Sequence, residues 1–332
     1  MNRLVNAWYK DARWVKLLRP LSAVFALVSS TRRKWQQNSE RQYKSALPLI
    51  VIGNVTVGGT GKTPLVIYLA QQLQELGFKP GIVSRGYGAK PPEYPFAVKP
   101  KTSHEEAGEE ALMIARQTQC PVIIDPDRVS AVKFLEALND CDVIISDDGM
   151  QHYRLARDFE IAVIDGQRGF GNGFLLPAGP LREKPDRLHS VDLVVCNGDS
   201  RFELPVDTIT MHLEATHLVH MKDSKFLSVN DEILQSLTAK KVHALAGIGN
   251  PERFFNSLCS CGFDIITHMF RDHHLYSEDD ITFDDDLDVV MTEKDAMKCS
   301  EFCGEQHWYL KVAARLPDGF MSAITNKLNL HT

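Results

Sequence analysis

The sequence predicts an α/β protein whose sheet is parallel and covered by helices on both faces. Short, nearly continuous apolar runs alternate with segments of helical pattern, as in strands that are buried on both faces. A glycine-rich segment joins the first apolar run to the first helix, which is typical of a phosphate-binding fold. The chain has 332 residues, with 44% hydrophobic and 24% charged residues, and this indicates a soluble globular protein with a full core and one or two domains.

The expected elements divide into two groups. In the first group, strands are predicted at 47–52, 81–84, 122–125, 142–146, 161–165 and 192–196, and helices at 65–76, 106–116 and 129–138. Near residue 200 the pattern changes, and the second group has strands at 208–219, 242–248, 263–269 and 289–292 and helices at 251–261 and 322–328. We expect a nucleotide-binding core at 46–200 and a smaller α/β domain at 201–332, whose last helix could return to the core.

The glycine-rich segment predicts a nucleotide-phosphate site. Glycines let the main chain curl so that its N–H groups point at phosphate oxygens, and the N-terminus of the following helix adds partial positive charge. In such a loop a lysine reaches the β- and γ-phosphates and a threonine hydroxyl binds Mg²⁺. The residues expected to form this site are Thr56, Val57, Gly58, Gly59, Thr60, Gly61, Lys62 and Thr63.

This loop departs from the common phosphate-loop motif at one position. Thr56 stands where the motif has its first glycine. An ordinary glycine-rich turn between a strand and a helix is therefore the alternative. The partition and septum-site ATPases fit less well, because they need a lysine where this chain has Val57.

Two pairs of adjacent acids are candidates for a role in the site. Asp147 and Asp148 follow the strand at 142–146, which is the usual position of a second magnesium anchor. Adjacent residues of an extended chain point to opposite sides, so one carboxylate should face the metal and the other should orient a neighbour. A helix-capping turn is the alternative. Glu109 and Glu110 open a helix, whose N-terminus alone would suffice to stabilise them.

Two further groups of residues could take part in binding or catalysis. Arg182 and Glu183 lie in a proline-rich loop, where an arginine can bind phosphate through two hydrogen bonds. Asp272 precedes His273 and His274 in the second half of the chain. A histidine beside a carboxylate can act as a general base, and a metal site is the alternative for this group.

The first 45 residues are strongly basic. They contain ten lysines and arginines and two acidic residues, a net charge of +8, whereas the whole chain has a net charge of −6. A basic arm on an acidic body indicates a nucleic acid or an anionic membrane as partner. Apolar and aromatic residues among the basic ones favour the membrane and argue against nucleic acid: Trp8, Tyr9, Trp14, Val15, Leu17, Leu18, Leu21, Val24, Phe25, Leu27, Val28 and Trp35.

The length of the uncharged run in this arm indicates how it would meet a membrane. The run covers residues 20–31, shorter than the about 20 apolar residues that span a bilayer. We therefore expect residues 1–45 to form an amphipathic, membrane-associated segment in the interface on the cytoplasmic side. A helix packed on the protein's own core is the alternative. The oligomeric state is not indicated by the sequence.

Several long motifs resemble those of the tetraacyldisaccharide 4′-kinase family. They lie at 53–64, 84–88, 147–155, 170–183, 247–255, 272–273 and 291–296, and the resemblance extends over nearly the whole chain. The resemblance implies ATP- and Mg²⁺-dependent transfer of the γ-phosphate to the 4′-hydroxyl of an acylated disaccharide 1-phosphate lipid. The product would be lipid IVA, made for lipid A at the cytoplasmic face of a Gram-negative inner membrane. A membrane-associated ATPase switch that phosphorylates no lipid is the alternative.

The resemblance also implies roles for individual residues. It assigns catalysis to Lys62, Arg182, Glu109 and His273, contact with the lipid phosphate to Arg128, and the metal side to Thr63, Glu110, Asp147, Asp148, Gln151 and Glu183. His273 is preferred to His274, which falls on a less fixed position of the motif. Glu109 departs from the family pattern, which has aspartate there. Glutamate is one methylene longer than aspartate, so its carboxylate lies at a different place. This matters because a displacement of a catalytic group by about 1 Å can change a rate by about 10²-fold.

Overall fold

A computed structural model describes residues 3–10, 12–38, 40–229 and 241–330 of the chain. The described residues form two compact units, a larger one within 3–212 and 315–330 and a smaller one within 213–314. The chain passes from one unit to the other within two strands, β8 (Ile209–His220) and β13 (His307–Arg315). Most strands of both units pair in parallel, so the predicted α/β class is confirmed.

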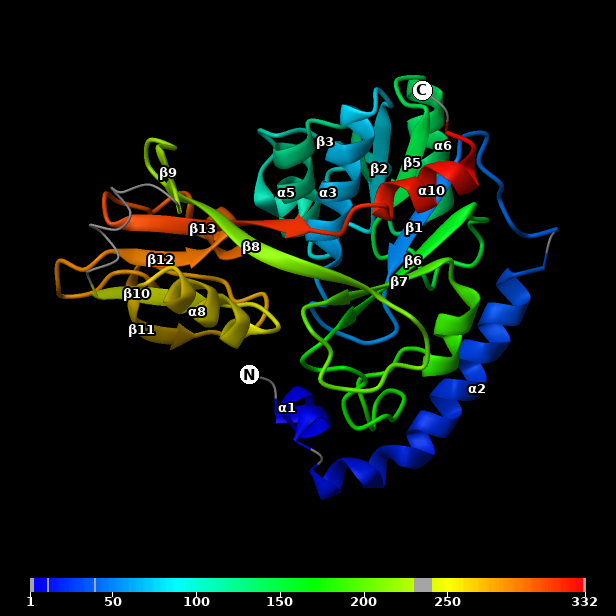
Figure 1. Cartoon of the computed structure of the whole chain (residues 1–332), viewed down its shortest axis with the longest axis horizontal. Helices are drawn as coiled ribbons and strands as arrows, with labels where there is room; N and C mark the ends of the chain where they lie inside the picture. The colour runs from blue at the N-terminus through cyan, green and yellow to red at the C-terminus, as the bar shows by residue number, and fades with distance from the viewer. Residues whose placement is uncertain (1–2, 11, 39, 230–240, 331–332) are drawn as a thin grey trace. The chain divides into compact units, whose positions relative to one another are not determined.

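The larger unit contains the sheet that the sequence predicted. Its strand order is β8-β7-β6-β1-β5-β2-β4-β3, and all neighbours pair in parallel except β3, which is antiparallel to β4 (Figure 1). The strands are β1 (Leu49–Gly53), β2 (Pro80–Ser84), β3 (Phe96–Val98), β4 (Val122–Ile124), β5 (Val143–Ser146), β6 (Phe159–Asp165) and β7 (Leu193–Asn197). The helices are α3 (Lys62–Glu75), α4 (His104–Ala107), α5 (Glu109–Thr118), α6 (Arg128–Leu138), η2 (Pro185–Ser190) and α10 (Phe320–Leu328).

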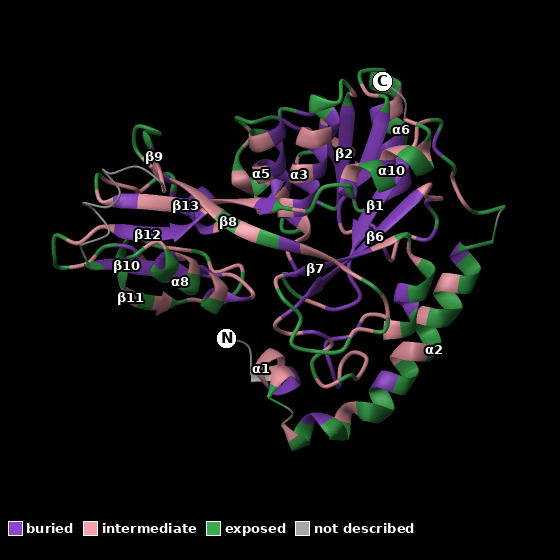
Figure 2. Ribbon diagram, viewed as in Figure 1, coloured by how far each residue is buried: buried purple, intermediate pink, exposed green. Residues whose placement is uncertain are grey.

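The central strands of this unit are buried on both faces (Figure 2). Successive side chains of a strand point to opposite faces, and every residue of β1 is buried. Leu49 and Val51 join Val132 and Leu135 of α6 in one apolar cluster. Helix α3, which contacts β1 and β2, packs on the sheet as well. The continuous apolar runs of the sequence therefore correspond to strands between layers of helices.

The larger unit extends along the chain as far as His212. Bends and irregular chain fill the segment between β7 and β8. The first part of β8 still pairs with β7, since Ile209 lies opposite Val195. The contacts of β8 therefore keep the chain in the larger unit as far as His212. The last helix, α10, also belongs to the larger unit, where Phe320 contacts Tyr68 of α3.

The smaller unit is a second α/β layer structure. Strands β11, β10, β12 and β13 pair in parallel in that order, β13 neighbours β8, and β9 is antiparallel to β8. Its other elements are β9 (Phe226–Ser228), β10 (Lys241–Ala246), α8 (Pro251–Ser260), β11 (Asp264–Met269), η3 (Glu278–Asp280), β12 (Val289–Thr292) and α9 (Glu293–Cys299). Phe254, Phe255 and Leu258 of α8 pack on Val242 and Val290 of the sheet.

The N-terminal arm belongs to the larger unit and consists of α1 (Arg3–Tyr9), η1 (Arg13–Leu18) and α2 (Arg19–Gln36). Two residues of α2, Ser22 and Gln36, are buried. An apolar stripe remains exposed along the arm, and its members are Leu17, Leu21, Val24, Leu27 and Val28. In the described part of the chain, no helix is long and apolar enough to cross a membrane.

Candidate active site

The glycine-rich loop runs from the end of β1 to the start of α3, as the sequence predicted. Gly58 has a φ of +110° and Gly61 a φ of +96°, values that favour glycine because other residues are strained there. Side chains on either side hold the loop: the Asn54 amide donates to Thr60 Oγ1 at 3.2 Å, and the Asn197 amide donates to the Thr60 carbonyl at 3.0 Å. Lys62 and Thr63 form the first turn of α3. A helix N-terminus behind a curled loop is a ready site for phosphate.

The two aspartates after β5 face different partners. Asp147 is buried, and its Oδ2 accepts a hydrogen bond from Ser84 Oγ at 3.2 Å. Asp148 has a φ of +46° and pairs with Lys62 Nζ at 3.3 Å and with Arg182 Nη1 at 3.1 Å. Although burial opposes it, the charges of Lys62 and Arg182 hold the pKa of Asp148 well below its usual range. Asp148 therefore links the phosphate-loop lysine to the arginine of the proline-rich loop.

The carboxylates around Asp147 fit a divalent cation. Burial raises the pKa of Asp147 to about 7, and the charge of Glu110 adds to this shift. Among the described residues, Asp147 Oδ1 is buried and accepts no hydrogen bond. A cation at this position would supply the missing partner and offset the repulsion between the carboxylates. No group of three or more His, Cys, Asp or Glu side chains suited to a metal is found in the described residues, but Mg²⁺ in nucleotide enzymes uses one or two carboxylates with phosphate oxygens and water.

This cluster predicts how stability depends on pH. The raised pKa of Asp147 means that its contribution to the free energy of unfolding is greatest below the ordinary aspartate pKa and is lost as the pH rises through about 7. With a chelator present and without nucleotide, the free energy of unfolding of Asp147→Asn, relative to that of wild type, should therefore be larger at pH 8 than at pH 5. Urea unfolding at both pH values measures this difference. The exposed Asp140→Asn is the control, and a difference for Asp147→Asn that does not change with pH would contradict the prediction.

Arg182, Glu183 and Gln151 form one hydrogen-bonded group. The Gln151 amide donates to Glu183 Oε1 at 2.9 Å and to the Asn54 carbonyl at 3.0 Å. Its Oε1 accepts from Arg182 Nη1 at 3.3 Å. Gln151 thus connects the start of the phosphate loop to both residues of the proline-rich loop. The structure brings these three predicted residues together with Lys62 and Asp148.

Arg128 is almost completely buried, with 1% of its surface exposed. Its guanidinium donates to the main-chain carbonyls of Asp125 at 2.8 Å and Asp147 at 3.2 Å, and so joins the ends of β4 and β5. Burial lowers the pKa of Arg128 to about 10. Within the described residues its buried Nε has no hydrogen-bond partner. Contact between Arg128 and a lipid phosphate stays a prediction.

The predicted catalytic pair is divided between the units. Glu109 is the first residue of α5 in the larger unit, and His273 lies in the smaller unit. His273 has a φ of +59°, and its Nε2 is 3.9 Å from Asp272 Oδ1. His274 instead stacks on Phe270 and lies 3.1 Å from Asp280. The choice of His273 over His274 and the pairing of His273 with Glu109 both stay predictions.

Three residues near Glu183 were not predicted. The Tyr153 hydroxyl donates to Glu183 Oε2, and burial with the charge of Glu183 raises the pKa of Tyr153 to about 12. Arg187 Nε lies 3.7 Å and Arg33 Nη1 3.5 Å from the same carboxylate oxygen. Tyr153 lies within the motif at 147–155, which is the one sequence signal that could have identified it. Nothing local in the sequence connects Arg33 to residue 183.

The fold and this site define a class of protein. A parallel sheet carries a phosphate loop between β1 and α3, with carboxylates at the end of β5 and a lysine, an arginine and an acid in contact. These are the parts of a phosphate-loop nucleotide-binding enzyme.

Comparison with known proteins identifies the family. The family model described as tetraacyldisaccharide-1-P 4′-kinase matches residues 14–329. The chain belongs to this family. A tetraacyldisaccharide 4′-kinase of Pseudomonas syringae pv. tomato is 44% identical over 328 residues, covering 98% of this chain and 97% of the relative. One of Psychromonas ingrahamii is 44% identical over 324 residues, covering 97% of this chain and 98% of the relative.

A solved structure agrees with this assignment. It is a crystal structure of the "apo" form of LpxK from Aquifex aeolicus in complex with ATP. Its sequence is 28% identical, the TM-score is 0.77, and the match covers 95% of this chain and 99% of that chain. The resemblance noted in the sequence is therefore confirmed over nearly the full length of the protein.

Proposed function

We propose that this protein transfers the γ-phosphate of ATP to the 4′-hydroxyl of a tetraacylated disaccharide 1-phosphate, giving lipid IVA for lipid A. The observation that carries the proposal is the continuous contact of Lys62, Asp148 and Arg182 beside the phosphate loop, in a chain of the tetraacyldisaccharide-1-P 4′-kinase family. ATP with Mg²⁺ is the phosphate donor, and the lipid disaccharide is the acceptor.

The residues of the larger unit bind and neutralise the phosphates. Main-chain N–H groups of residues 58–61 and the N-terminus of α3 hold the β- and γ-phosphates. Lys62 and Arg182 place two positive charges where the transferred group becomes more negative. Mg²⁺, when bound, neutralises further charge on the phosphates. The residues suited to its side of the site are Thr63, Glu110, Asp147, Asp148, Gln151 and Glu183.

The acceptor hydroxyl requires a base. We assign this role to His273, with Glu109 as the carboxylate that raises the basicity of the imidazole. His273 belongs to a motif of the family, and Glu109 stands where the family has aspartate. The exposed fraction of the His273 side chain, 35%, leaves it accessible to a substrate. Arg128 is assigned to the phosphate of the lipid acceptor.

The arm is proposed to hold the enzyme on the cytoplasmic face of the inner membrane. Leu17, Leu21, Val24 and Val28 recur at the spacing of one helix face, and each is more than half exposed. Such a stripe beside basic residues fits the interface of an anionic membrane. The acylated substrate resides in the same membrane.

Charged residues on this stripe should release the enzyme from membranes. The double variant Leu21→Asp and Val28→Asp is expected to lose most of its binding to phosphatidylethanolamine and phosphatidylglycerol vesicles, because burying two carboxylates in the interface is costly. Sedimentation of vesicles with the bound protein measures the loss. Ser29→Asp with Ser30→Asp adds the same charge beside the stripe and is the control. Equal binding by wild type and the stripe variant would contradict the proposed anchor.

The alternative is an ATPase switch that phosphorylates no lipid. The kinase and the ATPase switch are distinguished by incubating the protein with γ-labelled ATP and tetraacyldisaccharide 1-phosphate in detergent micelles, with Mg²⁺ or with chelator. The kinase predicts a labelled lipid that forms only with Mg²⁺. Labelled free phosphate without labelled lipid would favour the switch.

A further inference from the structure

Helix α2 contacts the candidate active site through one charged side chain. Arg33 Nη1 lies 3.5 Å from Glu183 Oε2, and the Arg33 guanidinium lies over the Tyr153 ring at 4.9 Å. Tyr153 itself donates a hydrogen bond to Glu183. The Arg33 side chain is 33% exposed and that of Glu183 is 12% exposed. Arg33 therefore reaches from the surface of the arm to a carboxylate that is nearly buried.

A chain of direct contacts continues from Glu183 to the phosphate-loop lysine. The Gln151 amide donates to Glu183, and its oxygen accepts from Arg182. Arg182 donates to both oxygens of Asp148 at 3.1 Å, and Asp148 pairs with Lys62. An unbroken series of side-chain contacts therefore runs from Glu183 through Arg182 to Lys62.

The other cation beside Glu183 is engaged elsewhere. Arg187 Nη2 pairs with Glu160 at 2.5 Å, and its Nη1 donates to Ser190 at 2.7 Å. Only its Nε faces Tyr153, at 3.1 Å, and Glu183, at 3.7 Å. Arg187 is thus fixed by the core of the unit. Arg33 is the contact through which the position of α2 can act on Glu183.

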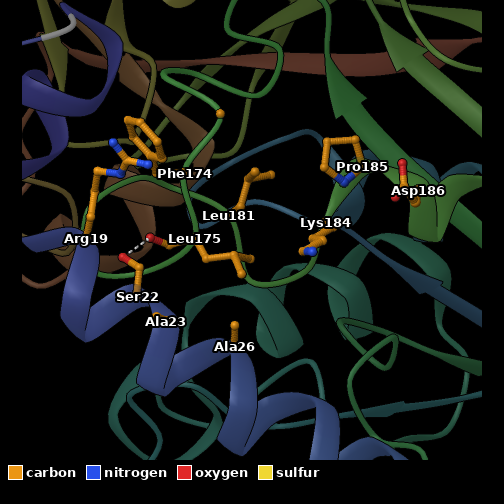
Figure 3. Close-up of a pocket in the computed structure, with 11 residues that line it drawn as sticks. Arg19, Ser22, Ala23, Ala26, Phe174, Leu175, Leu181, Lys184, Pro185 and Asp186 are labelled. Carbon is orange, nitrogen blue, oxygen red and sulfur yellow. Dashed lines mark hydrogen bonds between the residues drawn. The ribbon is translucent and has the colours of Figure 1, made fainter. Parts of the chain in front are cut away.

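A second contact places α2 on the same loop. Ser22 Oγ donates to the Leu175 carbonyl at 2.8 Å (Figure 3). It also accepts from the Ala178 amide at 3.1 Å. The loop in turn pairs with the phosphate loop, since the Val57 amide donates to the Pro180 carbonyl at 2.8 Å. A cavity of about 340 Å³, lined partly by Ala23 and Ala26 of α2, lies along this contact. Residues 172–183 are therefore held between α2 and the phosphate loop.

We propose that Arg33 is a positioning residue for phosphate transfer, through which helix α2 orients Glu183 and, by way of Gln151, Arg182. The proposal rests on the proposed function for its kinetic consequence. Arg33 touches neither the phosphate loop nor Lys62 in this network. Its partial exposure makes a large effect on folding stability unexpected, because exposed ion pairs contribute little. Its effect should appear in turnover.

The test compares Arg33→Met with Arg33→Lys and with Lys34→Met. Lys34 is the exposed neighbour on the same helix, so its methionine variant removes the same charge from the arm. Arg33→Met should have a kcat about tenfold below that of Lys34→Met, with equal KM values for ATP and lipid and equal binding to phosphatidylethanolamine and phosphatidylglycerol vesicles. Arg33→Lys should restore part of the kcat. In a Glu183→Gln background, Arg33→Met should have little further effect.

Amide hydrogen exchange of residues 172–183 without nucleotide gives a readout independent of activity. Arg33→Met should speed exchange there relative to Lys34→Met. Equal kcat and equal exchange in the two variants would overturn the proposal, as would a loss of kcat matched by a loss of vesicle binding. The proposal would also be overturned if Arg33→Met lowered kcat as much in the Glu183→Gln background as in the wild type. If the wild type transferred no phosphate to lipid, the proposed function would fail, and the exchange result would still decide the role of Arg33.

Discussion

Replacing Lys62 by alanine is expected to lower phosphate transfer by about 10²–10³-fold or more, the scale seen when one preorganised charge-stabilising group is removed. Lys62 is the first residue of α3, and its amine lies 3.3 Å from Asp148. Without it, the β- and γ-phosphates lose a positive charge in a nearly buried position. Asp148 keeps its pair with Arg182, so the carboxylate is not left alone and the fold should persist. Initial rates with labelled ATP measure the loss.

The exposed Lys79→Ala serves as the matched control for Lys62→Ala. It removes the same side chain from the same unit, at a position where the contact to Asp142 comes from the main chain. Circular dichroism and thermal unfolding should be similar for the two variants. A folded Lys62→Ala enzyme with near-normal transfer would mean that the loop does not act on the transferred phosphate.

The second large effect is expected at the proposed base. His273→Ala should lower the rate of transfer by about 10²–10⁴-fold, the contribution typical of a general base. Glu109→Ala should have a similar effect if the carboxylate acts through the imidazole. For the same reason the double variant should be little worse than either single variant. Single-turnover transfer at saturating ATP isolates the chemical step.

Two comparisons make this prediction specific. Glu109→Asp introduces the residue usual in the family and should retain transfer if the position is the one that faces His273. His189→Ala removes an exposed histidine from η2 of the larger unit and should behave as wild type. Fully additive losses in the Glu109 and His273 double variant would show that the two residues do not act as a pair.

Much of the architecture could be predicted from local patterns. Strands such as β1 and β5 are continuous apolar runs because they lie between layers of helices, and each was expected within two residues of its observed bounds. Helix α9 and strand β13 were not predicted. Helix α9 has seven residues and directly follows β12, so neither its length nor a break in the pattern marks it. In β13 the residues alternate poorly, because several are only partly buried.

The candidate site was predictable only in part, for a related reason. Lys62 and Thr63 follow glycines in a motif whose spacing suits the binding of phosphate. Asp147 and Asp148 directly follow a strand that is obvious in the sequence. The contacts that join these residues are between side chains far apart in sequence. Arg33 and Glu183 are 150 residues apart, and no periodicity connects them. The roles assigned to Glu109 and Arg128, and the choice of His273 over His274, depended on family resemblance.

The most direct test of the kinase assignment is the structure of the product. Purified protein, ATP, Mg²⁺ and tetraacyldisaccharide 1-phosphate would be incubated in micelles, with Lys62→Ala run in parallel, and the lipid analysed by mass spectrometry and phosphorus NMR. The account predicts a lipid with one added phosphomonoester at the 4′ position, formed by the wild type and not by Lys62→Ala. An unchanged lipid together with released phosphate, or a phosphate at another hydroxyl, would contradict it.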